Sequence, residues 1–291
     1  MPATDHARPT VPFLAATGAI IVFTTMDAVV KAMPPGLPTI QVVAMRFAFG
    51  VPLVLLALWW LRAGWPSAAS WRANAPRGLL TVASTFLFFT ALRRLPFAEA
   101  LALSYLGPLL IALLAALLLK ERLRADVVGA VLLGLGGVGV IAWDSLSEAG
   151  ELSGDVVGIA AAVGSAFTYA LNTVLLRHQA QRDNATSIVL ILHIVPTLIA
   201  LPIAASDWQP VGGGVWATFL LVAALGVSGH FLLTWAFGRA RAGVLAIVDY
   251  LALPYAAIVG FVFFGEVPAA AVWSGAGLIV VACLIVTRRR G

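Results

Sequence analysis

Residues 98–124 read AEALALSYLGPLLIALLAALLLKERLR, and residues 243–267 read GVLAIVDYLALPYAAIVGFVFFGEV. In each segment a tyrosine stands sixteen residues before a glutamate: Tyr105 before Glu121, and Tyr250 before Glu266. One proline follows each tyrosine, Pro108 and Pro254, and a further apolar segment follows each copy. This shared spacing predicts that the chain contains one five-helix unit twice, in residues 1–147 and 148–291.

The composition of the 291 residues excludes an ordinary soluble protein. Hydrophobic residues make up 61% of the chain and charged residues only 11%, whereas roughly a quarter of a typical soluble domain is charged. We therefore expect the chain to lie in a lipid bilayer. The net charge of +5 sits in short loops, so it does not indicate a nucleic-acid partner. Cys283 is the single cysteine, which excludes a disulfide framework or a cysteine-based metal site, and we expect neither metal nor cofactor.

Ten segments are long enough to cross a bilayer, because an apolar core about 30 Å thick needs roughly 20 helical residues. The first segment is as long as the later ones, so it predicts a retained span and not a cleaved signal peptide. The predicted spans are residues 12–32, 38–61, 77–94, 97–119, 125–143, 155–177, 187–205, 213–237, 243–264 and 268–287.

The basic residues predict how these spans are oriented. With the N-terminus in the cytoplasm, nearly all arginines and lysines fall on the cytoplasmic side, including Arg77, and only Arg93 and Arg94 lie outside. Both termini are then cytoplasmic. Arginine outnumbers lysine sixteen to two, and this bias, with abundant alanine and glycine, is typical of GC-rich bacterial genomes. We therefore expect a multi-pass protein of a bacterial inner membrane.

An odd number of spans in each unit has a topological consequence. The second unit must enter the membrane from the opposite face, so the two repeats are inverted. Inverted repeats can pack on one another in two nearly equivalent ways, which is the basis of alternating access to a site at the membrane midplane. The acid-rich connection at residues 144–155 would join the two units.

These features resemble the drug/metabolite transporter superfamily of EamA type. The pattern is closest in LSYLGPLLIALLAALLLKERL followed by GAVLLGLGGVGVIAW, and in FFGEV followed by WSGAGLIVVACLIV. The resemblance covers nearly the whole chain. It implies an all-α integral membrane protein of ten transmembrane helices that acts as a secondary carrier of a small organic metabolite. The second repeat departs from the pattern, because its proline lies one residue later and Asn172 stands about where Asp27 would be.

Ionisable residues within the spans are the first candidates for a site, because a charge at a helix centre costs about 2.5–3.5 kcal/mol. Asp27 and Lys31 are four residues apart, so they share one face of the first span. Asp27 either contacts a substrate or proton in a cavity or forms a self-neutralised pair with Lys31. Arg46, about two turns into the second span, either binds a substrate carboxylate or ties its helix to Asp27 or to backbone carbonyls.

Asp249 and Tyr250 on the ninth span lead the candidates. Asp249 has no basic neighbour four positions away, so nothing on its own helix neutralises it. It is either a protonated carboxyl bonded to another helix, or a group in a water-filled cavity that could carry a coupling proton. Ser104 and Tyr105 occupy the corresponding positions in the first repeat, and inverted symmetry would bring both pairs toward one central space.

The remaining candidates could equally be packing residues. Pro108 and Pro254 each remove a backbone hydrogen bond, and either expose carbonyls to a substrate or only bend the helix. Glu99 near the outer start of the fourth span is expected to be solvated beside Arg93 and Arg94. Polar and aromatic residues that could line a cavity, or simply pack inside the bundle, are Tyr169, Asn172, His230 and Trp235.

Three other functions remain open at this stage. A multidrug or toxic-metabolite exporter would have the same fold. An intramembrane serine protease is suggested by GVSG at residues 226–229, but no histidine follows His230 to act as the base, so we expect no catalytic residues. A channel or structural subunit needs neither inverted repeats nor Asp249. The small residues of the fifth and tenth spans could form scaffold contacts or the face of a homodimer.

Overall fold

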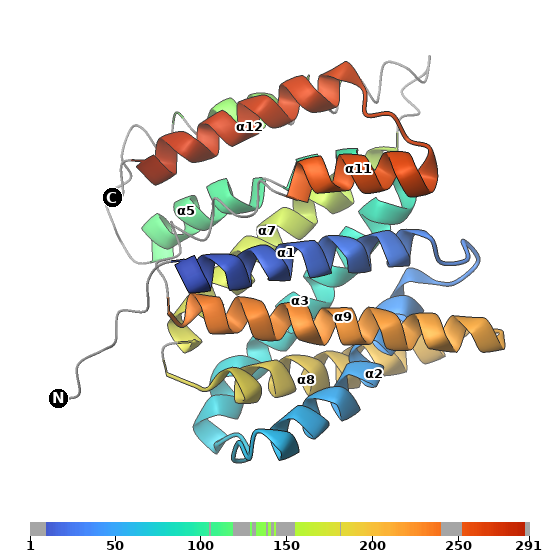
Figure 1. The fold of residues 1–291 in the computed structure, drawn as a ribbon, viewed down its shortest axis with the longest axis vertical. Helices are drawn as coiled ribbons and strands as arrows, with labels where there is room; N and C mark the ends of the chain where they lie inside the picture. Colours follow the sequence, from blue (N-terminus) through green and yellow to red (C-terminus); the bar gives the residue numbers. More distant parts are fainter. Residues whose placement is uncertain are drawn as a thin grey trace.

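The computed structural model describes residues 10–104, 106–118, 129, 132–137, 139, 140, 143, 155–180, 182–239 and 252–288. Every regular element in these residues is an α-helix (Figure 1), which confirms the all-α membrane fold. Six helices are long and apolar enough to cross a membrane: α1 (Thr10–Lys31), α2 (Thr39–Trp60), α3 (Ala68–Arg94), α7 (Val156–Gln179), α8 (Ala185–Ala205) and α9 (Gly213–Phe237). The shorter ones are α4 (Phe97–Ser104), α5 (Leu106–Leu118), α11 (Ala252–Phe264) and α12 (Ala270–Arg288).

The third span is longer than the sequence predicts. Helix α3 begins at Ala68, nine residues before the predicted start, and it contains Pro76. Ser67 caps its first turn, because the Ser67 side chain accepts a hydrogen bond from the Ser70 amide at 3.1 Å. Arg77 therefore lies inside the helix and is only 1% exposed. Arg77 is thus a buried residue within the helix and not a basic residue that flanks the span.

The helices pack in symmetric pairs. Helix α1 packs on α9 and α3 packs on α7, while α2 packs on α8 (Figure 1). In the two repeats α1 corresponds to α7, α2 to α8 and α3 to α9. Exchanging the corresponding helices turns the pair α1–α9 into the pair α7–α3 and leaves the pair α2–α8 unchanged. Each repeat therefore buries its long helices mainly against the other repeat, as an inverted-repeat fold requires.

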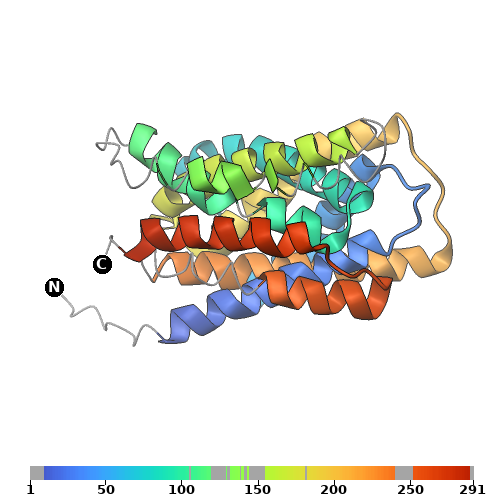
Figure 2. The ribbon, with the colours of Figure 1, turned by 90° about the horizontal axis from the view of Figure 1, so that it is seen from above.

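Two ionic contacts show how the repeats are inverted. The end of α1 lies beside the end of α3, because Lys31 Nζ donates to the Leu95 carbonyl at 2.6 Å. The start of α7 lies at the same end of the bundle, since Arg94 forms an ion pair with Asp155 at 2.8 Å. The first helix of the second repeat thus starts where the first helix of the first repeat finishes. Figures 1 and 2 show that α1 starts, and α12 finishes, at the opposite end.

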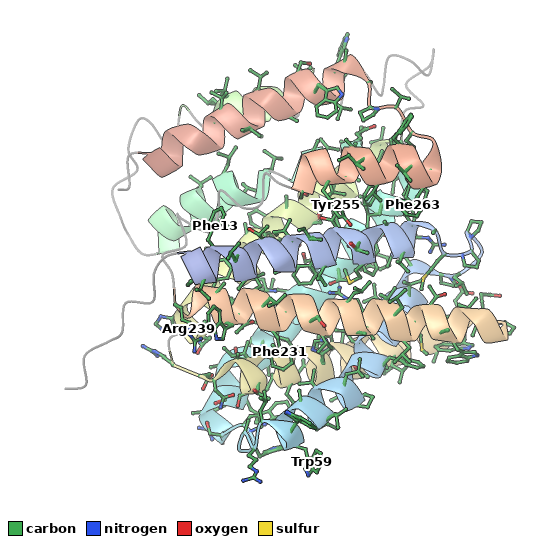
Figure 3. The ribbon with its side chains drawn as sticks, viewed as in Figure 1. Phe13, Trp59, Phe231, Arg239, Tyr255 and Phe263 are labelled. Atoms are coloured by element: carbon green, nitrogen blue, oxygen red, sulfur yellow. The ribbon has the colours of Figure 1, made fainter. Side chains whose placement is uncertain are left out.

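The outer surface of the bundle carries large apolar side chains, as expected for a lipid-facing surface. Trp59 at the end of α2 is 71% exposed and Phe263 on α11 is 74% exposed; both are labelled in Figure 3. Trp60 lies beside Trp59 and is also exposed, and tryptophans at a helix end are typical of a membrane interface. On the inner side of α11, the Tyr255 hydroxyl hydrogen-bonds Thr25 of α1 at 2.9 Å.

Candidate substrate-binding cavity

A cavity of about 230 Å³ lies inside the bundle, between helices of both repeats. On α9 its lining begins at His230, and on α7 no lining residue precedes Ser165. On these two helices the lining lies toward the end at which they finish, away from Lys31, whereas on α1 it lies between Ile20 and Asp27, in the half nearer Lys31. Its main polar lining residues are Asp27, Arg46, Arg77, Thr81, Asn172 and His230.

Arg46 of α2 occupies the centre of this lining. The side chain is buried, and its guanidinium donates to Thr85 Oγ1 on α3 and to His230 Nε2 on α9, each at 3.3 Å. Its Cζ atom also lies 5.5 Å from the centroid of the Phe89 ring. Because a guanidinium only donates, the bond fixes His230 Nε2 as an acceptor. Arg46 Nε is buried without a hydrogen-bond partner, so the two bonds leave donor capacity unused.

Asp27 of α1 lines the same cavity and is buried, with 6% of its surface exposed. Its carboxylate and the Arg46 guanidinium attract one another. They are not in contact, however, because no hydrogen bond or ion pair within 4.0 Å joins Asp27 to any residue in the described part of the chain. The site thus places two opposite charges near each other without letting them neutralise each other directly.

Lys31 does not pair with Asp27, and this part of the sequence prediction was wrong. Lys31 Nζ forms an ion pair with Glu266 Oε1 at 3.1 Å, and Glu266 Oε2 accepts a hydrogen bond from the Phe97 amide at 2.6 Å. Glu266 thus joins α1 to the first turn of α4, where a carboxylate is favoured by the helix dipole. Sequence spacing placed Lys31 and Asp27 on one face, but the loop after α11 supplied a closer carboxylate.

We expect the Glu266→Gln variant to lose about 1–2 kcal/mol of stability, because an ion pair and a charge-assisted hydrogen bond become neutral contacts. Thermal unfolding of the purified protein in detergent measures this loss. Arg94→Gln is the matched control, since its ion pair with Asp155 is more exposed and should contribute roughly 0–1 kcal/mol. Equal melting temperatures for the two variants would contradict the role given to Glu266.

Arg77 lines the cavity from α3 and was not among the predicted site residues. Its Nε donates to Asn172 Oδ1 at 3.0 Å and its Nη1 to Asn74 Oδ1 at 2.8 Å. Asn172 Nδ2 in turn donates to Thr81 Oγ1 at 3.0 Å. Thr81 and Thr85 follow Arg77 at intervals of four residues, so one face of α3 presents a polar stripe to the cavity. That stripe is the sequence signal that could have identified Arg77.

His193 lies behind His230 and does not line the cavity. Its Nδ1 donates to the Val189 carbonyl at 2.7 Å, and its ring meets the His230 ring edge-on with centroids 5.7 Å apart. Its buried Nε2 has no hydrogen-bond partner. Gly50 of α2 is the reason for this close fit, because a Cβ at Gly50 would come within 2.9 Å of that nitrogen.

The other predicted site residues fall into three groups. Ser104 and Tyr169 line the cavity, and the Ser104 hydroxyl donates to the Leu101 carbonyl at 2.6 Å. Trp235 does not line it, because it packs beside Ala16 and Ala236 and lies under the Arg239 guanidinium at 4.2 Å. The residues that lie outside the described part of the chain are Tyr105, Asp249 and Tyr250.

The two prolines fall in the described helices, but a hinge at either one stays a prediction. Pro108 lies in α5 and Pro254 lies in α11. Glu99, by contrast, corrects an expectation. It is 4% exposed within the first turn of α4, so it is buried and not solvated beside Arg93 and Arg94.

The GVSG sequence forms a packing surface on α9. A Cβ at Gly229 would lie 2.7 Å from Phe23 of α1, and one at Gly226 would lie 3.0 Å from Arg46 Nε. Ser228 is on the exposed side of the helix, and His230 accepts its bond from Arg46. The glycines therefore let α9 approach α1 and α2 closely, and Ser228 has no base beside it among the described residues.

The comparison with protein families agrees with this fold. The model of the EamA-like transporter family matches residues 11–143 and, a second time, residues 156–288. The chain belongs to the EamA-like transporter family. The two matches start 145 residues apart, and the same interval separates Asp27 from Asn172 and Thr85 from His230. Arg46 thus bonds to two side chains, Thr85 and His230, that occupy equivalent places in the two EamA repeats.

Several curated proteins resemble this EamA chain over most of its length. The pseudopaline exporter CntI of Pseudomonas aeruginosa (strain UCBPP-PA14) is 30% identical over 95% of this chain and 96% of its own. The riboflavin transporter of Rhizobium johnstonii is 28% identical over 98% of this chain and 94% of its own. A solved crystal structure with 26% identity covers 97% of this chain and 99% of its own, with a TM-score of 0.64. The protein is therefore a multi-pass membrane transporter of small molecules and not an enzyme.

Proposed function

We propose that the protein is a secondary transporter that moves an amino-acid-like zwitterion across a bacterial inner membrane by alternating access. The observation that carries the proposal is the pair of opposite charges, Asp27 and Arg46, held in one buried cavity without a direct ion pair. A charge buried within a membrane protein is costly unless it has a partner. A solute with one carboxylate and one ammonium group would supply a partner to each.

The two side chains suit the two ends of such a solute. The Arg46 guanidinium has five N–H donors, of which Thr85 and His230 occupy two, and guanidinium groups bind carboxylates with two parallel hydrogen bonds. The Asp27 carboxylate only accepts when ionised, which suits an ammonium group. Phe23, Phe88 and Phe89 provide apolar wall beside them. A small organic solute with an α-amino acid head and an apolar or amphipathic body fits this lining.

The packing of the repeats supports alternating access. Both repeats contribute lining side chains, and those on α7 and α9 lie toward one end of the bundle. At the other end, Lys31 is paired with Glu266, and Gln41 and Gln209 exchange two hydrogen bonds at 2.8 and 3.0 Å. Opening that end would require these contacts between the repeats to break. In that state the pair α1–α9 would take the packing that α3–α7 has here, and the reverse.

We also propose that transport is coupled to protons through Asp27. We therefore expect Asp27→Asn to abolish accumulation driven by a pH gradient in proteoliposomes, because the amide neither binds nor releases a proton. Counterflow of the same solute without a gradient should persist at a reduced rate. Asp207→Asn, which makes the same change at an exposed carboxylate outside the cavity, is the control, and it should keep gradient-driven accumulation. Unchanged accumulation by Asp27→Asn would remove Asp27 from coupling and leave Asp249 as the candidate.

Export of toxic or drug-like compounds is a second candidate function. The aromatic residues Phe23, Phe88 and Phe89 in the cavity wall favour it, since aromatic walls bind varied apolar solutes. The two functions differ in what inhibits transport. Competition by apolar cations, and none by zwitterionic amino acids, would favour the drug exporter over the amino-acid-like substrate.

The proposed orientation in the membrane follows from the basic residues. Both termini would lie in the cytoplasm, with residues 144–155 outside, and labelling of single cysteines in a Cys283→Ala background tests this.

The proposal also includes a dimer face. The small residues of the fifth and tenth spans could form a homodimer face. Within that region Gly134 instead packs inward, because a Cβ there would lie 2.1 Å from Leu109 of α5, whereas Gly136 and Gly277 face open space. Cross-linking at Gly277 tests the dimer.

A further inference from the structure

We infer that Arg77 forms a second anion site in the cavity, so that the solute is a zwitterion bearing an additional acidic group remote from its amino-acid head. This inference rests on the proposed function, because it assumes that Asp27 and Arg46 hold that head. In the part of the chain described by the structure, the acidic and basic side chains of the lining are two guanidinium groups, one carboxylate and His230. A solute with a single carboxylate would leave one of the two guanidinium groups without an anionic partner.

Arg77 is buried without a direct carboxylate partner. Its two hydrogen bonds go to the neutral amide oxygens of Asn172 and Asn74. Neither bond involves Nη2, and Arg77 has no ion pair to any acidic residue that the structure describes. A guanidinium that is 1% exposed in a protein and bonded only to neutral groups retains its full charge, and a buried charge of this kind marks a binding site.

The acidic residue nearest to this network is separated from Arg77 by an amide. Asp183, in the loop between α7 and α8, accepts hydrogen bonds from Ser70 Oγ at 2.6 Å and from Asn74 Nδ2 at 2.9 Å. Asn74 therefore uses its Nδ2 for Asp183 and its Oδ1 for Arg77. This arrangement fixes the orientation of the Arg77 guanidinium, but Asp183 is linked to that guanidinium only through two hydrogen bonds and the Asn74 amide between them. The network thus positions Arg77 at the cavity wall and does not neutralise it by contact.

The distance between the two cations determines the shape of the solute. Arg46 bonds to Thr85, which is eight residues beyond Arg77 on the same helix. Thr85 and Arg77 are therefore separated by about 12 Å along the axis of α3. The stripe of Thr81 and Thr85 runs between them. An aspartate-like solute would be too short to reach both guanidinium groups. A longer aliphatic chain with a carboxylate at each end and an amine beside one of them would reach both.

The test compares three probes with the purified protein in nanodiscs by calorimetry. The probes are 2-aminosuberate, its ω-methyl ester, and norleucine, which share an amino-acid head and differ at the far end. We expect the wild-type protein to bind 2-aminosuberate at least about tenfold more tightly than the ω-ester, the usual contribution of a hydrogen bond to a charged group. The variants Arg77→Gln and Asn172→Asp should both abolish that preference, the second by giving Arg77 a carboxylate of its own.

Arg94→Gln, which removes an exposed arginine outside the cavity, should keep the preference and serves as the control. Loss of preference in both cavity variants would support the second site even if Arg77→Gln alone were poorly folded. A wild-type protein that binds norleucine but does not distinguish acid from ester would overturn this inference and leave the proposed function standing. Retention of the preference by Arg77→Gln would also overturn it. If none of the probes, norleucine included, binds to the wild type, the proposed function itself fails.

Discussion

Replacing Arg46 with glutamine is expected to lower the counterflow of an amino-acid zwitterion at least about 100-fold, since removing one partner of a buried charge pair costs about 2–5 kcal/mol or more. Glutamine keeps a donor near Thr85 and His230 but cannot hold a carboxylate with two parallel bonds. It also leaves Asp27 without the nearby cation that attracts it. Radiolabelled counterflow in proteoliposomes, normalised to reconstituted protein, measures the effect.

Thr85→Val is the matched control for Arg46. It removes one of the hydrogen bonds that orient the guanidinium but keeps the charge, so we expect a smaller loss of transport than in Arg46→Gln. Size-exclusion chromatography of both variants checks that they fold. If a well-folded Arg46→Gln transports at the wild-type rate, Arg46 is a tie between α2, α3 and α9, and the solute carboxylate binds elsewhere.

Replacing Gly78 with alanine is expected to destabilise the protein by about 1–3 kcal/mol or more, the usual range for overpacking a close helix contact. A Cβ at Gly78 of α3 would lie 2.4 Å from Val195 Cγ1 and 2.7 Å from Val195 Cβ on α8. Valine is branched at that carbon and cannot rotate out of the way. Helices α3 and α8 would have to separate beside Arg77, so we expect both the melting temperature and transport to fall.

Two further variants separate this contact from a general effect of alanine. Gly277 on α12 has open space where a Cβ would lie, so Gly277→Ala should be neutral or stabilising, with a gain of up to about 1 kcal/mol from helix propensity. Val195→Ala introduced together with Gly78→Ala should recover part of the loss, because it removes the clashing methyl groups. A Gly78→Ala melting temperature equal to that of Gly277→Ala would contradict the packing described here.

The positions of the helices could be predicted from apolar length because the bilayer leaves few alternatives. In lipid, backbone groups must hydrogen-bond within the helix, and so an apolar segment of sufficient length has essentially one structure. The predicted bounds of α1, α2 and α9 accordingly agree with the structure to within two residues. Helix α3 did not follow this rule at its start, because Arg72, Asn74 and Pro76 made the first turns of the helix resemble a polar loop.

The candidate site was predicted only in part, because a sequence gives the face of a helix but not its neighbour. Asp27, Arg46, Asn172 and His230 were found as polar residues within apolar spans, and the structure places all of them on one cavity. The partner of Lys31 depended on the loop that brings Glu266 to the end of α1, which spacing along one helix cannot reveal. Arg77 was missed because it stood at the start of the predicted third span and was counted there as a basic residue of the cytoplasmic flank.

The difference between Asp27 and Asn172 has a consequence for the orientation of the solute during transport. The two residues are equivalent in the repeats, yet only one is a carboxylate, so among the described lining residues the acidic side chain is on α1. If the halves rock as proposed, this carboxylate would move with its own repeat and would not change sides. A cargo whose amine binds Asp27 would then cross in one orientation, without turning end over end between loading and release.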